Sequence, residues 1–191
     1  MGYEVQVGIS YKHVHLSQKD LETLFGEGYE LTLKKELVQP GQFASEELVD
    51  VVGPKKTLSK VRVLGPVRKE TQVELALTDA RSIGLKVPVR ESGKLDGTPG
   101  CKLVGPKGEI ELDHGCIAAL RHVHLSLEQA KEAGVKDGDL IGIRIENDDR
   151  ALVFDKVLVR AKENFTAEVH IDTDEANAAG GNCDVCTLVV K

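Results

Sequence analysis

The chain has 191 residues and a formal net charge of −6, with 41% hydrophobic and 29% charged residues. The acidic balance argues against a nucleic-acid-binding protein, and 4% aromatic residues without tryptophan argue against a base-stacking surface. No apolar run approaches the roughly 18 residues that span a bilayer, and no signal peptide is apparent. We therefore expect a globular, cytoplasmic protein without nucleic-acid or membrane partners.

The first part of the chain predicts short strands separated by turns. Alternating apolar residues predict a strand over residues 3–10, and Ser17 with Asp20 starts a short helix that Gly26 ends. A second helix is expected to start at residues 78–80 and to end at Gly84. Further strands are expected at residues 31–33, 48–52, 58–64 and 72–77, with turns at 39–42 and 53–56.

Residues 90–100 are rich in glycine and are the best candidate for a linker. They suggest two domains, residues 1–95 and 96–191, with an approximate boundary because strands could exchange between the halves. After this linker we expect a helix at residues 126–133 and strands at 102–105, 109–112, 116–120, 140–145 and 156–160. The fold class is therefore mainly β (α+β): two small β-barrel domains with short capping helices.

One six-residue motif occurs twice, as residues 12–17 and 121–126, and each copy contains a His-Val-His triplet. In a strand the side chains of residues i and i+2 share one face, so both imidazoles of a triplet can bind one ion. A single triplet would be weak support, because a strand histidine is usually an ordinary half-buried residue. Two copies in the same context favour metal ligands, which are His13, His15, His122 and His124.

The two halves also match further along the chain. The offset that aligns Lys60 with Lys156 also aligns Glu74 with His170. Glu74 and His170 each have hydrophobic residues on both sides. Each half then supplies three ligands, which leaves coordination positions open as in catalytic sites, and imidazole with carboxylate suits Zn²⁺, Co²⁺, Fe²⁺ or Mn²⁺. The alternative is that Glu74 is an exposed strand carboxylate and His170 a surface imidazole.

Four segments resemble the PduL-type phosphate propanoyltransferases, a family of phosphotransacylases: residues 7–17, 65–74, 121–126 and 170–177. The resemblance covers nearly the whole chain. It implies a tandem β-barrel repeat with a dinuclear zinc site at the interface of the two domains. It also implies transfer of an acyl group between coenzyme A, a substrate, and inorganic phosphate, with propanoyl-CoA or a similar short acyl-CoA such as acetyl-CoA.

The family pattern also implies roles for individual residues. One zinc ion would be held by His13, His15 and Glu74, and the other by His122, His124 and His170. Arg68 would bind phosphate, for which its planar charged fork is suited; without the resemblance it is a solvated cation. Lys55 and Arg62 are equally compatible with ordinary surface charges. The coenzyme A contacts implied by the resemblance are Ile9, Ser10, Tyr11, Lys55, Arg62 and Asn177.

Two features depart from the family pattern. Cys183 and Cys186 form a CxxC motif, but Cys101 and Cys116 do not supply the second pair of a zinc ribbon, so we interpret all four as free thiols. Some relatives carry an amphipathic leader that directs them into a bacterial microcompartment for propanediol degradation. The sequence shows no such extension, so association with a microcompartment shell would use another surface. A homodimer is also compatible with the sequence.

Two other functions fit the same ligands. A dinuclear zinc hydrolase would use water in place of phosphate to cleave a thioester or an amide. A non-catalytic metal-binding module would have closed coordination spheres and would release no thiol in response to phosphate. Phosphate-dependent release of coenzyme A distinguishes the acyltransferase from both alternatives.

Overall fold

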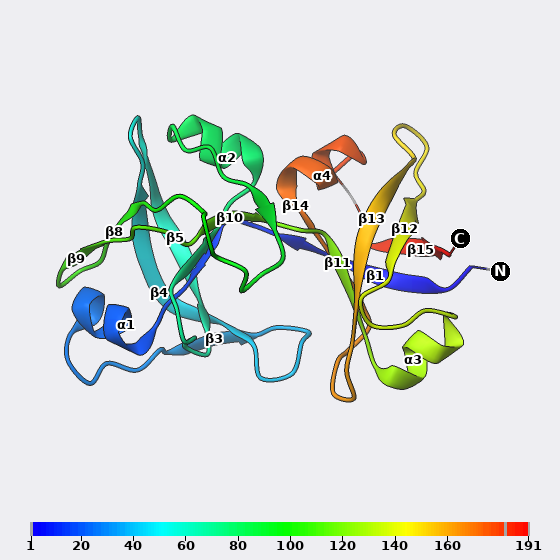
Figure 1. The fold of residues 1–191 in the computed structure, drawn as a ribbon, viewed down its shortest axis with the longest axis horizontal. Coiled ribbons are helices and arrows are strands. Elements are labelled where there is room, and N and C mark those ends of the chain that lie inside the picture. The colour runs from blue at the N-terminus through cyan, green and yellow to red at the C-terminus, as the bar shows by residue number, and fades with distance from the viewer. Residues whose placement is uncertain (1, 182, 191) are drawn as a thin grey trace. The chain divides into compact units, whose positions relative to one another are not determined.

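The structure, a computed structural model, describes residues 2–181 and 183–190 (Figure 1). Strands predominate there, as expected for a mainly β protein, and the helices are short. No helix among these residues is long and apolar enough to cross a membrane. By its contacts the chain divides into unit 1, Met1–Tyr11, Val38–Pro40 and Leu120–Lys191, and unit 2, Lys12–Leu37 and Gly41–Ala119. The division into residues 1–95 and 96–191 stays a prediction.

Unit 1 is built on a closed barrel with strand order β1-β14-β11-β13-β12-β15. Alternate residues of its strands point inward, and Val123, Ile143 and Val169 are fully buried in the core. The strands are β1 (Glu4–Ser10), β11 (His122–Leu125), β12 (Leu140–Ile145), β13 (Leu152–Ala161), β14 (Glu168–Asp172) and β15 (Val185–Val189), and the helices are α3 (Leu127–Glu132) and α4 (Thr173–Ala178).

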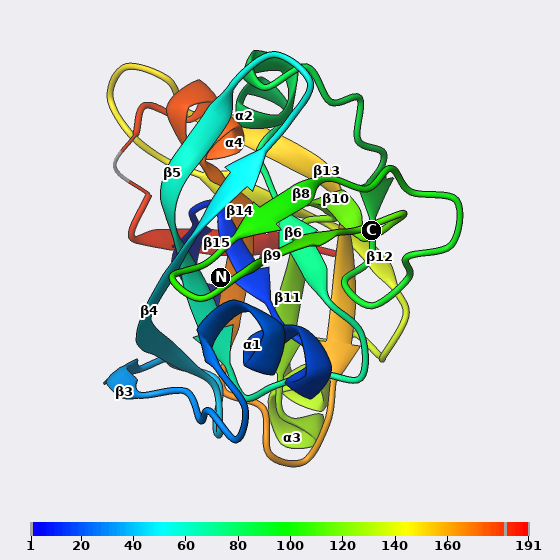
Figure 2. The same ribbon diagram turned by 90° about the vertical axis from the view of Figure 1, so that its left-hand side faces the viewer.

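Unit 2 contains a sheet with strand order β7-β10-β6-β2-β5-β4-β8-β9, and β3 pairs with β4. The strands are β2 (His13–His15), β3 (Leu33–Glu36), β4 (Phe43–Val52), β5 (Thr57–Gly65), β6 (Gln72–Glu74), β7 (Val89–Arg90), β8 (Lys102–Val104), β9 (Glu109–Glu111) and β10 (Cys116–Ala119). The helices are α1 (Gln18–Phe25) and α2 (Leu77–Ser82). Helix α1 lies beside the β8–β9 turn (Figure 2), where the Lys107 N–H donates to the Leu24 carbonyl at 2.9 Å.

The His-Val-His strand has equivalent neighbours in the two units. β2 pairs in parallel with β5 and antiparallel with β6, and β11 pairs in the same way with β13 and β14. The strand that precedes each triplet lies in the opposite unit, because β1 pairs with β14 and β10 pairs with β6. Lys60 and Lys156 share a left-handed backbone with φ of 57°. These features match the offset found in the sequence.

Most predicted elements are present, and the starts of α1 and α3 agree in detail. Ser17 caps α1 by accepting from the Asp20 N–H at 3.2 Å, and Gly26 ends the helix with φ of 119°. Ser126 and Gln129 form a reciprocal capping box at α3.

Several boundaries predicted in the first half were wrong. The strand expected at residues 48–52 begins already at Phe43. The strand expected at residues 31–33 is Leu33–Glu36, because its pairing with β4 begins at Leu33. The strand expected at residues 72–77 ends at Glu74, where its pairing with β2 ends. Helix α2 follows already at Leu77, after an extended Ala76 whose side chain makes no capping hydrogen bond.

Candidate metal centres

Three predicted ligands of unit 2 lie together on two adjacent strands. His13 and His15 project from β2, and His13 is directly opposite Glu74 of β6. The two Nε2 atoms are 3.2 Å apart, and the Glu74 carboxylate oxygens lie 3.4 Å from His13 Nε2 and 3.8 Å from His15 Nε2. Val14, between the histidines, is fully buried in the core. The two-residue period of a strand therefore produces the convergence that the sequence predicts.

The charges in this group match the protonation states that metal ligands need. Burial lowers the pKa of His15 well below its usual value, and the neighbouring His13 and Arg68 lower it further. Burial raises the pKa of Glu74, but His13, His15 and Arg68 lower it by more, so it lies well below its usual range. A neutral imidazole beside an ionised carboxylate is the form in which both residues bind a cation.

A serine that the sequence did not single out connects this group to Arg68. The Ser92 hydroxyl donates to Glu74 Oε1 at 3.0 Å and accepts from Arg68 Nη1 at 3.0 Å. Gln72 Nε2 donates to the same hydroxyl at 2.9 Å and also to Glu74 Oε1, and the Gly93 N–H donates to Gln72 Oε1 at 2.7 Å. The predicted linker therefore supplies residues that hold this site. Its glycine-rich composition carried no signal of such a role.

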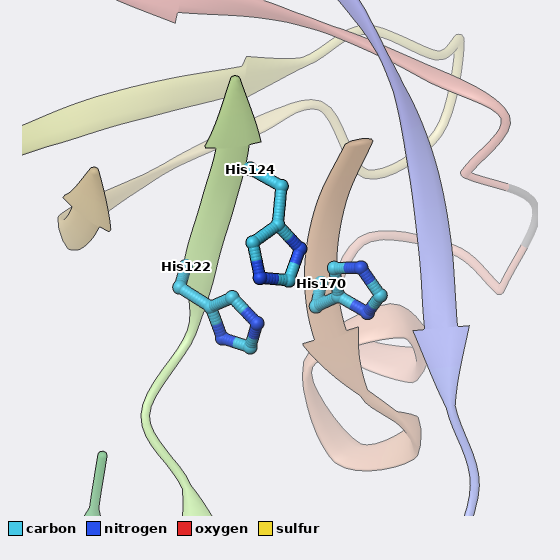
Figure 3. A group of neighbouring side chains, drawn as sticks. All are labelled: His122, His124 and His170. Atoms are coloured by element: carbon cyan, nitrogen blue, oxygen red, sulfur yellow. The ribbon is translucent and has the colours of Figure 1, made fainter. Parts of the chain in front are cut away.

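The predicted ligands of unit 1 also converge. His122 and His124 project from β11, and His170 of β14 is directly opposite His122. The three rings lie close together (Figure 3), with centroids 4.8 to 5.0 Å apart. In each of the two groups the candidate ligand atoms lie within 4.8 Å of one another. His122 Nδ1 is 2.9 Å from the Leu120 carbonyl, which can only accept, so Nε2 is the nitrogen that can bind a metal.

His124 provides a test of whether a metal fits here. Burial, with His122, His170, Arg160 and Lys162 nearby, lowers the pKa of His124 to about 2. Its buried Nδ1 has no hydrogen-bond partner within the described residues. Leaving such an atom unsatisfied is unfavourable, whereas a bound cation would use a nitrogen of this neutral ring. Three convergent imidazoles therefore fit Zn²⁺.

The remaining predicted residues are distributed over both units. In unit 1, the register of β1 with β14 places Ile9 opposite Ile171 and Ser10 opposite Asp172, which caps the helix that contains Asn177. Tyr11 follows and is exposed.

In unit 2, Lys55 is exposed, and its side chain lies against Gly84, where an added Cβ would be 2.8 Å from Lys55 Cγ. Arg62 Nη1 donates to the carbonyls of Ser45 and Glu46 at 2.9 and 3.0 Å. Arg62 therefore also holds β5 against β4, a structural role that the sequence did not indicate.

The four cysteines are buried free thiols, as expected from their spacing. Burial raises the pKa of Cys186 to about 12, so its thiol stays protonated at neutral pH. In the described part of the chain, the two metal-compatible groups contain histidine and glutamate and no cysteine.

Known proteins resemble the chain over nearly its whole length. The family model described as phosphate propanoyltransferase matches residues 6–182. A protein of that name from Thermotoga maritima is 57% identical over 185 residues, which cover 97% of this chain and 88% of that protein. Proteins of the same name from Lachnoclostridium phytofermentans and Salmonella typhimurium are 52% and 49% identical. Their matches cover 95% and 93% of this chain, and 85% and 84% of the relatives.

Proposed function

The chain belongs to the phosphate propanoyltransferase family and is thus an acyltransferase, and we propose that it transfers a propanoyl or similar short acyl group between coenzyme A and inorganic phosphate. A phosphate oxygen attacks the thioester carbonyl, the carbon–sulfur bond breaks, and coenzyme A leaves as a thiolate. Such a thiol has a pKa of roughly 8.5, so its departure needs no strong general acid. The observation that carries the proposal is the pair of convergent three-ligand groups.

We propose that the two groups hold two Zn²⁺ ions. His13, His15 and Glu74 would hold one, and His122, His124 and His170 the other. Bound Zn²⁺ polarises a carbonyl oxygen and attracts an anionic substrate. Burial favours the neutral, metal-binding form of the His15 and His124 imidazoles.

Arg68 would bind the phosphate. Its guanidinium is permanently charged, and its donors can pair with two phosphate oxygens at once. The bond to Ser92 restricts the side chain before substrate arrives, which lowers the entropy lost on binding. Because Ser92 also donates to Glu74, the same hydroxyl aligns the phosphate-binding residue with the metal-binding carboxylate.

Coenzyme A would contact Ile9, Ser10, Tyr11, Lys55, Arg62 and Asn177, with the two basic residues near its phosphates. We further propose that the chain is a tandem repeat of one β-barrel domain and that both metal centres act on one substrate. The equivalent strand pairings around the triplets and the shared φ of Lys60 and Lys156 support the repeat.

The test is release of free coenzyme A thiol from propanoyl-CoA and acetyl-CoA, with and without phosphate, before and after chelation. We expect release that depends on phosphate, stops on chelation and returns with Zn²⁺. His122→Ala should abolish it, whereas His114→Ala should not, because His114 lies at a partly exposed turn outside both groups. Release without phosphate would instead identify a thioester hydrolase, and no release would refute the proposal.

A further inference from the structure

A buried carboxylate lies beside the histidine group of unit 1. Glu168 precedes His170 by two residues on β14, so both side chains share one face of the strand. In the β11–β14 register Glu168 is directly opposite His124. Its side chain is buried, with 9% of the residue exposed, and Oε2 lies 2.9 Å from Nε2 of His170. Although the two atoms are this close, that nitrogen has no hydrogen-bond partner within the described residues, Glu168 included.

Two other residues hold this carboxylate in place. Gln39 Nε2 donates to Glu168 Oε2 at 3.2 Å and to the Thr166 carbonyl at 2.9 Å, and Gln39 Oε1 accepts from the Thr166 N–H at 3.3 Å. On the neighbouring strand β1, a Cβ at Gly8 would lie 2.5 Å from Glu168 Oε1. An amide thus anchors one oxygen, and the absence of a side chain leaves room for the other.

The corresponding position of unit 2 holds a glutamine. Gln72 precedes Glu74 by two residues and is directly opposite His15, as Glu168 is opposite His124. Gln72 donates its amide to the Glu74 carboxylate. A carboxylate ligand can only accept hydrogen bonds and has a donor beside it, whereas an imidazole ligand has an N–H to donate and has an acceptor beside it. The neighbour at this position therefore complements the ligand in each unit.

We infer that Glu168 is a positioning residue for the metal centre of unit 1. With a metal bound, its nearby carboxylate would accept the N–H of His170, which would fix the tautomer and the ring orientation and leave the other ring nitrogen for the metal. It also places one negative charge next to the three histidines. In unit 2 the corresponding charge belongs to Glu74, which is itself a candidate ligand. The candidate ligand atoms that lie within 4.8 Å of one another belong to the three histidines without Glu168, so we place Glu168 beside the ligands and not among them. The inference rests on the proposed zinc centres.

The first experiment measures metal affinity rather than catalysis. Apoprotein is titrated with Zn²⁺ against a chromophoric chelator, and Glu168→Gln is compared with Glu163→Gln, which removes an exposed carboxylate of the same unit. Loss of such a partner typically weakens metal binding about 10- to 100-fold. We expect this loss at one of two equivalents in Glu168→Gln and at neither in Glu163→Gln. The Co²⁺ absorption spectrum of one centre should also change, which a purely structural role would not produce in folded protein.

A second variant keeps the carboxylate and displaces it. Gly8→Ala places a methyl group against Glu168 Oε1 and should weaken the same single equivalent. Thermal unfolding of the apoproteins identifies any variant that fails to fold. Unchanged affinity and spectrum in folded Glu168→Gln would overturn the inference, and so would a loss as large as that in His124→Ala, which would make Glu168 a ligand. A wild-type chain that binds no zinc would refute the proposed metal centres, whereas failure of Glu168→Gln alone would refute only the positioning role.

Discussion

The two ligand groups have the same backbone arrangement and different chemistry. In both, a His-Val-His strand lies beside an antiparallel strand whose ligand is opposite the first histidine. In unit 2 that ligand is a carboxylate with amide and hydroxyl donors around it, and in unit 1 it is an imidazole beside a carboxylate. Strand register thus determines where the candidate ligands lie, and a few side chains determine the charge at each candidate centre.

The groups also differ in burial and in their neighbouring cation. His13, His15 and Glu74 are all buried, whereas His122 and His170 are partly exposed. Arg68 is linked through Ser92 to the group of unit 2 and is the residue proposed for phosphate. The comparison therefore predicts that substitutions around Glu74 alter the use of phosphate, whereas substitutions around His170 alter metal binding first.

The largest effects should follow removal of a ligand from either group. We expect His15→Ala and His124→Ala each to lose one zinc equivalent and to lower kcat by about 10³-fold, because a metal ion contributes several kcal/mol to the transition state. Metal analysis and thiol release measure the two effects, with His114→Ala as the control. Full activity in either variant would show that its centre is dispensable and that the two groups are not equivalent in function.

A smaller and more selective effect is expected at Arg68. Arg68→Lys retains the charge but loses the fork, so kcat/KM for phosphate should fall by about 100-fold while zinc content stays at the wild-type level. Steady-state kinetics with varied phosphate give the ratio. Arg81→Lys on the exposed side of α2 is the matched control. An unchanged KM for phosphate with a raised KM for the acyl-CoA would assign Arg68 to coenzyme A instead.

Ser92 should contribute less than the arginine it orients. Ser92→Ala removes the hydroxyl that accepts from Arg68 and donates to Glu74, each bond being worth roughly 1 to 2 kcal/mol. We expect the KM for phosphate to rise about tenfold, with both zinc equivalents retained. Ser82→Ala, which removes a hydroxyl bonded to the Asp79 carbonyl in α2, should leave phosphate kinetics unchanged. Equal effects of both substitutions would contradict the positioning role of Ser92.

The sequence was most informative where the signal is local. The residues of each His-Val-His triplet are two positions apart, and the repeat offset identified Glu74 and His170 as their partners. Ser92 and Gln39 could not be found in this way, because both lie in segments without periodicity and their contacts are distant in sequence. Gln39 is 129 residues from Glu168, and Ser92 is 18 residues from Glu74. Glu168 is two residues before His170, which the offset identified, but the role of Glu168 depends on which candidate ligand follows it.

The smallest predicted effect tests whether the two backbones are equivalent. Lys60 and Lys156 both have φ of 57°, which costs a residue with a Cβ roughly 1 kcal/mol and costs glycine little. Lys60→Gly and Lys156→Gly should therefore each raise the free energy of unfolding by up to about 1 kcal/mol, net of the greater chain entropy of glycine. Lys19→Gly in α1 should lower it by about 1 kcal/mol, because φ there is helical. Chemical denaturation measures all three. Changes of opposite sign in the free energy of unfolding at Lys60 and Lys156 would show that the two residues are not under the same backbone strain. The match between the units would then extend to the candidate ligands but not to the strands that carry them.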